Sequence, residues 1–474
     1  MASTSLLGCS GAATSPRAHE GAEPSASDPR AEVVAEDDLA QLELDGLIDH
    51  ALAEPETIPQ SAEQLRARFG SAALDHLIAR HRAEVPPAAR HGEGDRDWRA
   101  LIDAVAQQRD AHFGGLYWQR DLSEAQREAA RLGKPILSLR LLGELTSEFS
   151  CANSRLFRTV LYADPELARW LDANFVLHWS SERPAPRIAI DFGDGRKLER
   201  TITGNSAHFV LDAQGRTLDV IPGLYAPSAF RQALGESLDL HARLATLGPE
   251  LAAEQWSGVL AADHDRRFRA AVDRLGEELM LVRGRPSERA AIEAWLGAPP
   301  SAGQRVAAAQ AVPMALGKMK MEAPILAAAG DSLGGRPTRA PGPFQAPDDL
   351  ELTILGARLI GGLQLHPNTQ TIIAAERPFE ALVAEAERGA ALLALEQALV
   401  VALEQDTAKN TLELAPRVHA ELARRARAGE ALELAAVDVW LYARLFETPA
   451  SDPWLGLVDP SVYTGLVEGG IAKP

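Results

Sequence analysis

The chain has 474 residues, of which 46% are hydrophobic and 24% charged, and its formal net charge is −18 at pH 7. This composition excludes a wholly disordered chain, and the length predicts roughly two to four folded units. The acidic balance, with no basic patch to offset it, argues against a nucleic-acid partner, because a phosphate backbone would be repelled. No run of about eighteen apolar residues, as a transmembrane helix requires, occurs in the sequence. Few aromatic residues (5%) with abundant alanine and leucine predict mostly helical packing, and the excess of Arg over Lys is typical of a GC-rich bacterial genome.

Residues 1–33 are rich in Ser, Ala, Gly and Pro, which predicts a disordered tether. Within this tract, Leu6-Leu7-Gly8-Cys9 resembles the lipobox of bacterial lipoproteins, in which the cysteine is lipidated. The residues before Cys9 lack the basic region and the apolar stretch of a signal peptide. Two interpretations stay open: Cys9 carries a lipid anchor in the cell envelope and the start codon is placed too late, or Cys9 is an inert thiol of a cytoplasmic protein.

Residues 34–113 predict a helical region. Apolar residues such as Leu44, Leu47 and Ile48 recur mostly at three- and four-residue steps. The segment from Ser61 to Gln64 reads as a capping box that starts a helix before Leu65. Residues 86–97, rich in Pro, Gly and charge, predict a break.

Residues 114–245 predict alternating helices and strands. A helix over 123–131 ends at Gly133 in a left-handed cap, and a short buried strand follows at 136–141. Cys151 begins the next helix, and Asp164-Pro165-Glu166 has the N-cap, first-turn proline and acid that start another. The remaining elements are a strand at 175–179, a strand pair at 187–192 and 197–203, a hairpin at 208–212 and 217–221, and a helix at 226–244.

This order, with a cysteine at the start of the helix after the first strand, resembles the thioredoxin-like superfamily over residues 114–245. Lys134-Pro135 before the strand, Asn174-Phe175-Val176 and the run from Leu211 to Arg216 match strand entries of that family. The resemblance implies an α/β fold in which helices flank a central mixed sheet. The strand pair at 187–203 stands where the family has a helix.

The family begins its active-site helix with Cys-x-x-Cys, whose first thiol is activated by the helix N-terminus and whose second resolves the mixed disulfide. Here the run is Cys151-Ala-Asn-Ser154, so the resemblance implies a nucleophile without a resolving thiol and with Ser154 as its hydrogen-bond donor. Ser150 replaces the usual Trp, and Ser206 or Ala207 replaces the cis-proline. A cis bond before a residue other than proline costs about 2.5–4 kcal/mol, so a trans bond is expected.

Three functions follow from these residues. The first is a non-classical binding or scaffold module for an unknown protein client, without a cofactor. The second is monothiol exchange through Cys151 with a protein client or a small thiol such as glutathione. The third is a purely structural assembly component, with the membrane reached only through a lipid at Cys9.

Several polar residues near Cys151 are candidates for lining a cleft: Asn153, Asn205, Ser206 and His208. Asn205, Ser206 and His208 could orient a ligand, and His208 could deprotonate the thiol; the alternative is a strand-entry turn with a half-buried histidine. Two neighbouring segments have similar alternatives. Glu182-Arg183-Pro184 is either an ion pair at the edge of the same cleft or a solvated loop. Asp191, Asp194 and Gly195 form either a metal-binding turn or a hairpin.

The rest of the chain predicts a helical region at 246–333, a linker at 334–348 and a mainly helical region at 349–474. Helices are expected at 379–404, 415–428 and 431–446. We expect no metal site: His76 and His81 are five residues apart, which does not place them on one helix face, and His419, Asp406 and Glu404 read as surface charges. These regions carry no phosphate-binding loop and no Gly-x-Ser-x-Gly motif, so they offer no catalytic signature of their own.

Overall fold

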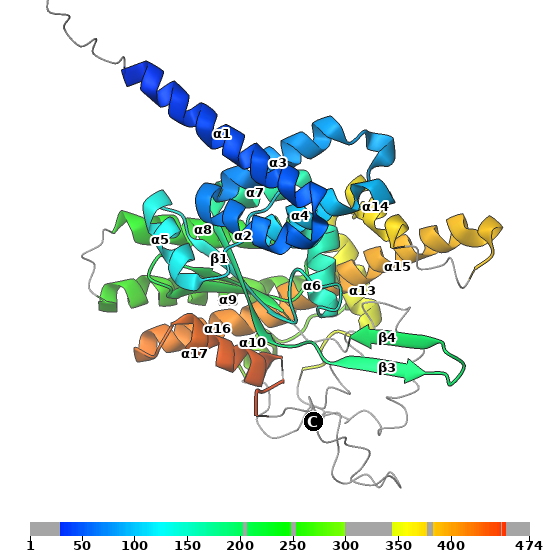
Figure 1. The fold of residues 1–474 in the computed structure, drawn as a ribbon. Coiled ribbons are helices and arrows are strands. Elements are labelled where there is room, and N and C mark those ends of the chain that lie inside the picture. The colour runs from blue at the N-terminus through cyan, green and yellow to red at the C-terminus, as the bar shows by residue number, and fades with distance from the viewer. Residues whose placement is uncertain are drawn as a thin grey trace, which may run out of the picture.

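The computed structural model describes residues 29–201, 206–247, 253–298, 344–376, 383–446 and 448–451. Most of these residues are helical, and the helices flank one four-stranded mixed sheet (Figure 1). At this level the expected combination of an α/β region with helical regions is confirmed. Cys9, Asn205 and most of the predicted linker lie outside the described residues.

The N-terminal helices pack around a core of their own, which includes Ile48, Leu65, Leu77 and Ile102. The helices are α1 (Pro29–Ala53), α2 (Ile58–Phe69), α3 (Ser71–Glu84) and α4 (Arg96–Ala106), with short 3-10 turns at Pro55–Thr57, Pro87–Ala89 and Glu93–Asp95. The predicted capping box is wrong, because Ser61 lies inside α2 and is buried. Pro59, whose ring favours the first turn of a helix, allows α2 to begin four residues earlier, with Thr57 instead of Ser61 as its N-cap.

The central sheet has the strand order β2-β1-β5-β6. Its strands are β1 (Ile136–Leu142), β2 (Val176–Arg183), β5 (Ala207–Leu211) and β6 (Thr217–Pro222). β1 runs parallel to β2 and antiparallel to β5, and β5 runs antiparallel to β6. Nearly every residue of β1, β5 and β6 is buried, because helices cover both faces of the sheet.

The helices around the sheet begin and end at or close to the residues that the sequence predicts. They are α5 (Leu122–Leu132), α6 (Ala152–Leu156), which continues as a π-helical turn at Phe157–Leu161, α7 (Pro165–Asn174) and α8 (Pro227–Thr246). The Asp164 carboxylate accepts hydrogen bonds from the amides of Glu166 and Leu167 and so caps α7. Gly133 ends α5 with a φ of 66°, a conformation that favours glycine.

The predicted strand pair is confirmed as a separate hairpin of β3 (Arg187–Asp191) and β4 (Lys197–Thr201), which projects from the body of the molecule (Figure 1). Asp191 pairs with Lys197 at 3.3 Å, and Asp194 pairs with Arg196 at 2.7 Å. Both carboxylates therefore pair with basic residues of the same hairpin, in the turn that the sequence predicts as a hairpin.

The C-terminal helices pack against the sheet and against one another. They are α9 (Ala253–Arg283), α10 (Arg289–Gly297), α13 (Asp349–Ile360), α14 (Pro367–Ala375), α15 (Arg388–Lys409), α16 (Ala415–Ala428) and α17 (Leu434–Trp440), with a 3-10 turn at Glu385–Glu387 and π-helical turns at Asn410–Leu414 and Leu441–Leu445. α16 lies along α9 (Figure 1). Leu403, Val418, Leu422 and Val437 are buried in the same core as the strands, so α15, α16 and α17 share one hydrophobic interior with the sheet. α10 and α13 pack with α9 around a separate core that includes Ile292 and Leu355.

We expect Gly356→Ala to destabilise the protein, because α13 and α15 meet at this glycine. A Cβ atom there would lie 2.1 Å from the carbonyl oxygen of Glu404, which belongs to the backbone of α15. Overpacking of this kind costs about 1–3 kcal/mol, so the free energy of unfolding measured in denaturant should fall by that amount.

Gly258→Ala is the matched control, since this glycine also lies within a helix but has no atom within 4 Å of the position that a Cβ would take. Alanine should leave stability unchanged or raise it by about 0.5–1 kcal/mol. Equal effects of the two substitutions would show that α13 and α15 do not approach each other this closely.

Candidate functional site

Cys151 is the N-cap residue of α6 and follows the loop after β1, as the sequence predicts. Its backbone is extended, with φ −60° and ψ 159°, and its amide donates a hydrogen bond of 3.1 Å to the carbonyl oxygen of Leu142. This hydrogen bond joins the start of α6 to the end of β1. The cysteine is therefore held where a sheet and a helix meet.

Two hydroxyl groups contact the thiol of Cys151. Its Sγ atom lies 3.0 Å from Ser154 Oγ and 3.1 Å from Ser206 Oγ. The predicted contact with Ser154 is therefore present, and Ser206, from the start of the hairpin, adds a second. The exposed fraction of Cys151 is 0%, and the residue belongs to the core of the sheet.

The other predicted cleft residues do not form an open site around the thiol. Asn153 is buried in α6. His208 is fully buried, not half-buried, and its Nε2 lies 2.5 Å from Tyr162 Oη, with Phe157 and Phe230 against its ring. Burial lowers the pKa of His208 to about 3, so the ring is neutral at pH 7. Its partner is the phenol of Tyr162, and not the thiol.

A charged cluster at the carboxyl end of β1 holds α17 against the sheet. Arg140 of β1 pairs with Glu182 of β2, and its Nη2 lies 3.3 Å from Asp438 Oδ2 of α17. Tyr442, in the turn after α17, donates a hydrogen bond of 3.4 Å to the carbonyl oxygen of Arg140. Glu182 is therefore part of a strand and of a partly buried ion pair, and not of a solvated loop.

The Arg140 cluster carries two acids and one base. Burial raises the pKa of Glu182 to about 7, and the nearby charge of Asp438 acts in the same direction. Burial also raises the pKa of Asp438, although Arg140 opposes this effect. The cluster therefore favours keeping one proton close to neutral pH, since two buried carboxylates face a single guanidinium.

We expect Glu182→Gln to make stability less dependent on pH. In the folded protein Glu182 holds its proton up to about pH 7, whereas its ordinary pKa is 4.5. The protonated Glu182 side chain therefore contributes fully to the free energy of unfolding below pH 4.5, and this contribution is lost as the pH rises through about 7. As the pH rises from 5 to 8, the wild type should therefore lose on the order of 1 kcal/mol more free energy of unfolding than the variant does.

Glu124→Gln is the control for this measurement, because that carboxylate lies on the exposed side of α5. Its effect on the free energy of unfolding should be within a few tenths of a kcal/mol at both pH values. A wild type that becomes more stable than Glu182→Gln as the pH rises from 5 to 8 would contradict the protonation assigned to the Arg140 cluster.

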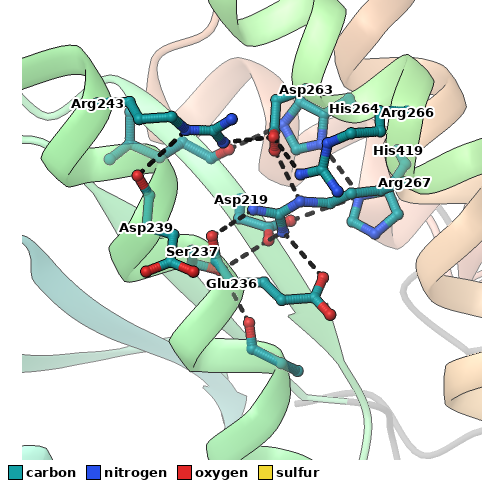
Figure 2. Close-up of polar contacts among 12 residues, drawn as sticks. Asp219, Glu236, Ser237, Asp239, Arg243, Asp263, His264, Arg266, Arg267 and His419 are labelled. Carbon is teal, nitrogen blue, oxygen red and sulfur yellow. Dashed lines mark hydrogen bonds and ion pairs between the residues drawn. The ribbon is translucent and has the colours of Figure 1, made fainter.

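A second buried polar cluster joins the sheet to three helices, and it was not among the sites expected from the sequence (Figure 2). Asp219 of β6 accepts hydrogen bonds of 2.7 Å from Arg267 of α9 and from Ser237 of α8. Arg267 also pairs with Asp263 at 2.7 Å. His264 of α9 and His419 of α16 complete the cluster, with 3.0 Å between their Nδ1 atoms.

The position of His419 corrects the expectation of a surface charge. The residue is 9% exposed because α16 lies along α9, and burial lowers its pKa to about 3. Asp406 and Glu404 are half-buried. One feature of the sequence could have indicated the cluster. Asp219 lies within the apolar strand Thr217–Pro222, and a buried carboxylate there needs polar partners.

A cavity of about 190 Å³ adjoins this cluster. His419, Arg267, Glu236, Arg274 and Thr411 are among the residues that line it. His76 and His81 lie outside this cluster and pair with separate carboxylates, those of Asp45 and Asp95.

Comparisons with protein-family models, with curated proteins and with solved structures find no match for this chain. Among the helices that the structure describes, none combines the length and the apolar character that crossing a membrane requires.

Proposed function

We propose that residues 114–245 form a thioredoxin-like domain that works as a binding or scaffold module, with Cys151 as a buried structural residue. Two features of the fold support the resemblance to that superfamily. The sheet has a central strand paired in parallel with β2 and antiparallel with β5, followed by the β5–β6 hairpin. The cysteine starts the helix that follows that central strand.

The burial of the sulfur is the main support for a structural instead of a redox role of Cys151. Thiol–disulfide exchange requires a sulfur atom of the partner to approach the attacking thiolate directly. Reactive cysteines accordingly sit in partly exposed environments, whereas buried ones are inert. Cys151 has no exposed surface, and two hydroxyl groups occupy the polar positions around its sulfur.

The position of α17 supports a scaffold role. Asp438 and Tyr442 contact Arg140, two residues before the end of β1, and Cys151 follows that end. The chain's own C-terminal helices therefore pack at the side of the sheet where the family places its substrate groove. A domain covered in this way serves as the packing centre for the helical regions around it.

Monothiol exchange is the second candidate, and one observation favours it. Ser154 Oγ lies 3.0 Å from the sulfur, and the sulfur sits at a helix N-terminus, so a thiolate formed there would receive both a hydrogen bond and the favourable end of the helix dipole. Exchange would then require the core around the sulfur, including Ser206, to open.

The test is the reactivity of Cys151 toward an alkylating reagent in a Cys9→Ser chain, where it is the single thiol. We expect native Cys151 to react at least about 100-fold more slowly than the same thiol in denaturant, because the reagent reaches it only when the core opens. Mass spectrometry of the alkylated chain over time measures both rates.

An exposed cysteine at an equivalent helix position is the control. Asp121 is the exposed N-cap residue of α5, so Asp121→Cys in a chain with Cys9→Ser and Cys151→Ser should react at the rate of a free thiol. If native Cys151 reacts as fast as this control and forms a mixed disulfide with oxidised glutathione, monothiol exchange replaces the scaffold proposal.

A further inference from the structure

We propose that Asp219, His264 and His419 form a binding site for a divalent transition-metal ion, with Zn²⁺ as the best fit. One carboxylate oxygen and one ring nitrogen from each histidine all lie within 4.8 Å of one another. Two imidazoles with one carboxylate, and a fourth position left open, are a donor set of catalytic zinc sites. The site does not involve Cys151, so it stands apart from the proposed scaffold function.

The hydrogen bond of His264 prepares its ring to be a metal ligand. Its Nε2 lies 2.9 Å from the carbonyl oxygen of Leu218, which only accepts hydrogen bonds, so Nε2 carries the proton. In a neutral imidazole, Nδ1 then holds the free lone pair, and Nδ1 faces His419. Metal-binding histidines almost always donate their other N–H to a carbonyl or carboxylate in this way.

The distances between the donor atoms bracket those of a zinc site. Zinc–nitrogen bonds of about 2.0–2.1 Å at tetrahedral angles separate two ligand atoms by about 3.3–3.4 Å. The two Nδ1 atoms are 3.0 Å apart, and Asp219 Oδ1 lies 3.8 Å from His419 Nδ1. The third pair, the Asp219 carboxylate and the His264 ring, lies within 4.8 Å, so these two side chains would have to move closer together for all three atoms to bind one ion.

The surroundings provide a second layer of contacts and an entrance. Ser237 and Arg267 both bind the other carboxylate oxygen of Asp219 and so hold it in place (Figure 2). Of the three ligands, His419 lines the 190 Å³ cavity, which has room for several waters, so an ion and a water as its fourth ligand would enter from that side. Because Arg267 already neutralises part of the charge of Asp219, we expect weaker binding than in a four-ligand structural zinc site.

The alternative is a site that never holds a metal. In that case His419 donates an Nδ1–H hydrogen bond to His264 Nδ1, and the three side chains only join α9, α16 and β6. The two possibilities differ in whether the purified protein takes up one metal ion at these residues.

The experiment is a titration of the chelator-treated full-length chain with Zn²⁺, followed by calorimetry and by metal analysis after desalting. We expect one ion per chain, and a loss of affinity of at least about tenfold in His264→Gln and in His419→Gln. His76→Gln is the matched control, because His76 also lies beside a carboxylate, that of Asp45, but on the surface. It should bind like the wild type.

Co²⁺ supplies a second measurement that does not depend on whether the variants fold. In the wild type, Co²⁺ bound at this site should give the visible bands of a four- or five-coordinate ion with nitrogen and oxygen ligands, without a thiolate charge-transfer band. The proposal is overturned if the wild type binds no ion, if the His264 and His76 variants bind equally, or if the Co²⁺ spectrum shows a thiolate ligand.

Discussion

The central sheet is covered on both faces, and this constraint shapes the rest of the structure. The strands β1, β5 and β6 have almost no exposed residue, since neighbouring helices such as α5 and α8 and the C-terminal helix α16 pack against the sheet. A polar group in such an interior loses its contact with water, so it must find a partner within the protein. The polar clusters around Cys151, Arg140 and Asp219 each meet that requirement.

The three clusters provide partners for their buried polar groups in different ways. Around Cys151 the partners are two neutral hydroxyls. At Arg140 one guanidinium pairs with two carboxylates whose pKa values are raised by burial, and the cluster holds α17 to the sheet. At Asp219 an ion pair with Arg267 joins β6 to α9, and the two histidines lie beside it. Removing one partner of a buried ion pair leaves an uncompensated charge, so these clusters specify how the helices dock.

Burial has opposite consequences for thiol exchange and for metal binding. It disfavours exchange at Cys151, because no partner sulfur can reach Sγ while the core is closed. At His264 and His419 the same packing brings two imidazole rings and the Asp219 carboxylate within 4.8 Å of one another, which is the arrangement that the proposed metal site needs. The proposed scaffold role and the proposed metal site therefore follow from the same physical cause.

The local elements around the sheet could be predicted from short stretches of sequence. These elements depend on residues that are close to each other in the sequence, and they were predicted. They include the caps at Gly133 and Asp164, the strands, the β3–β4 hairpin and the position of Cys151 at the start of a helix. Ser61 marks the limit of such predictions even locally, since Pro59 starts α2 earlier than the capping pattern indicated.

Which side chains are buried, and which of them meet, depends instead on contacts between distant segments. Asp219, His264 and His419 come from one strand and two helices far apart in the chain, and His419 looked like a surface residue because nothing near it in sequence shows that α16 lies along α9. The exposure of Cys151 likewise depends on the hairpin residue Ser206 and on the packing of distant helices. Local propensity reflects neighbouring residues, whereas burial is set by long-range packing, and the chemistry of this protein depends on burial.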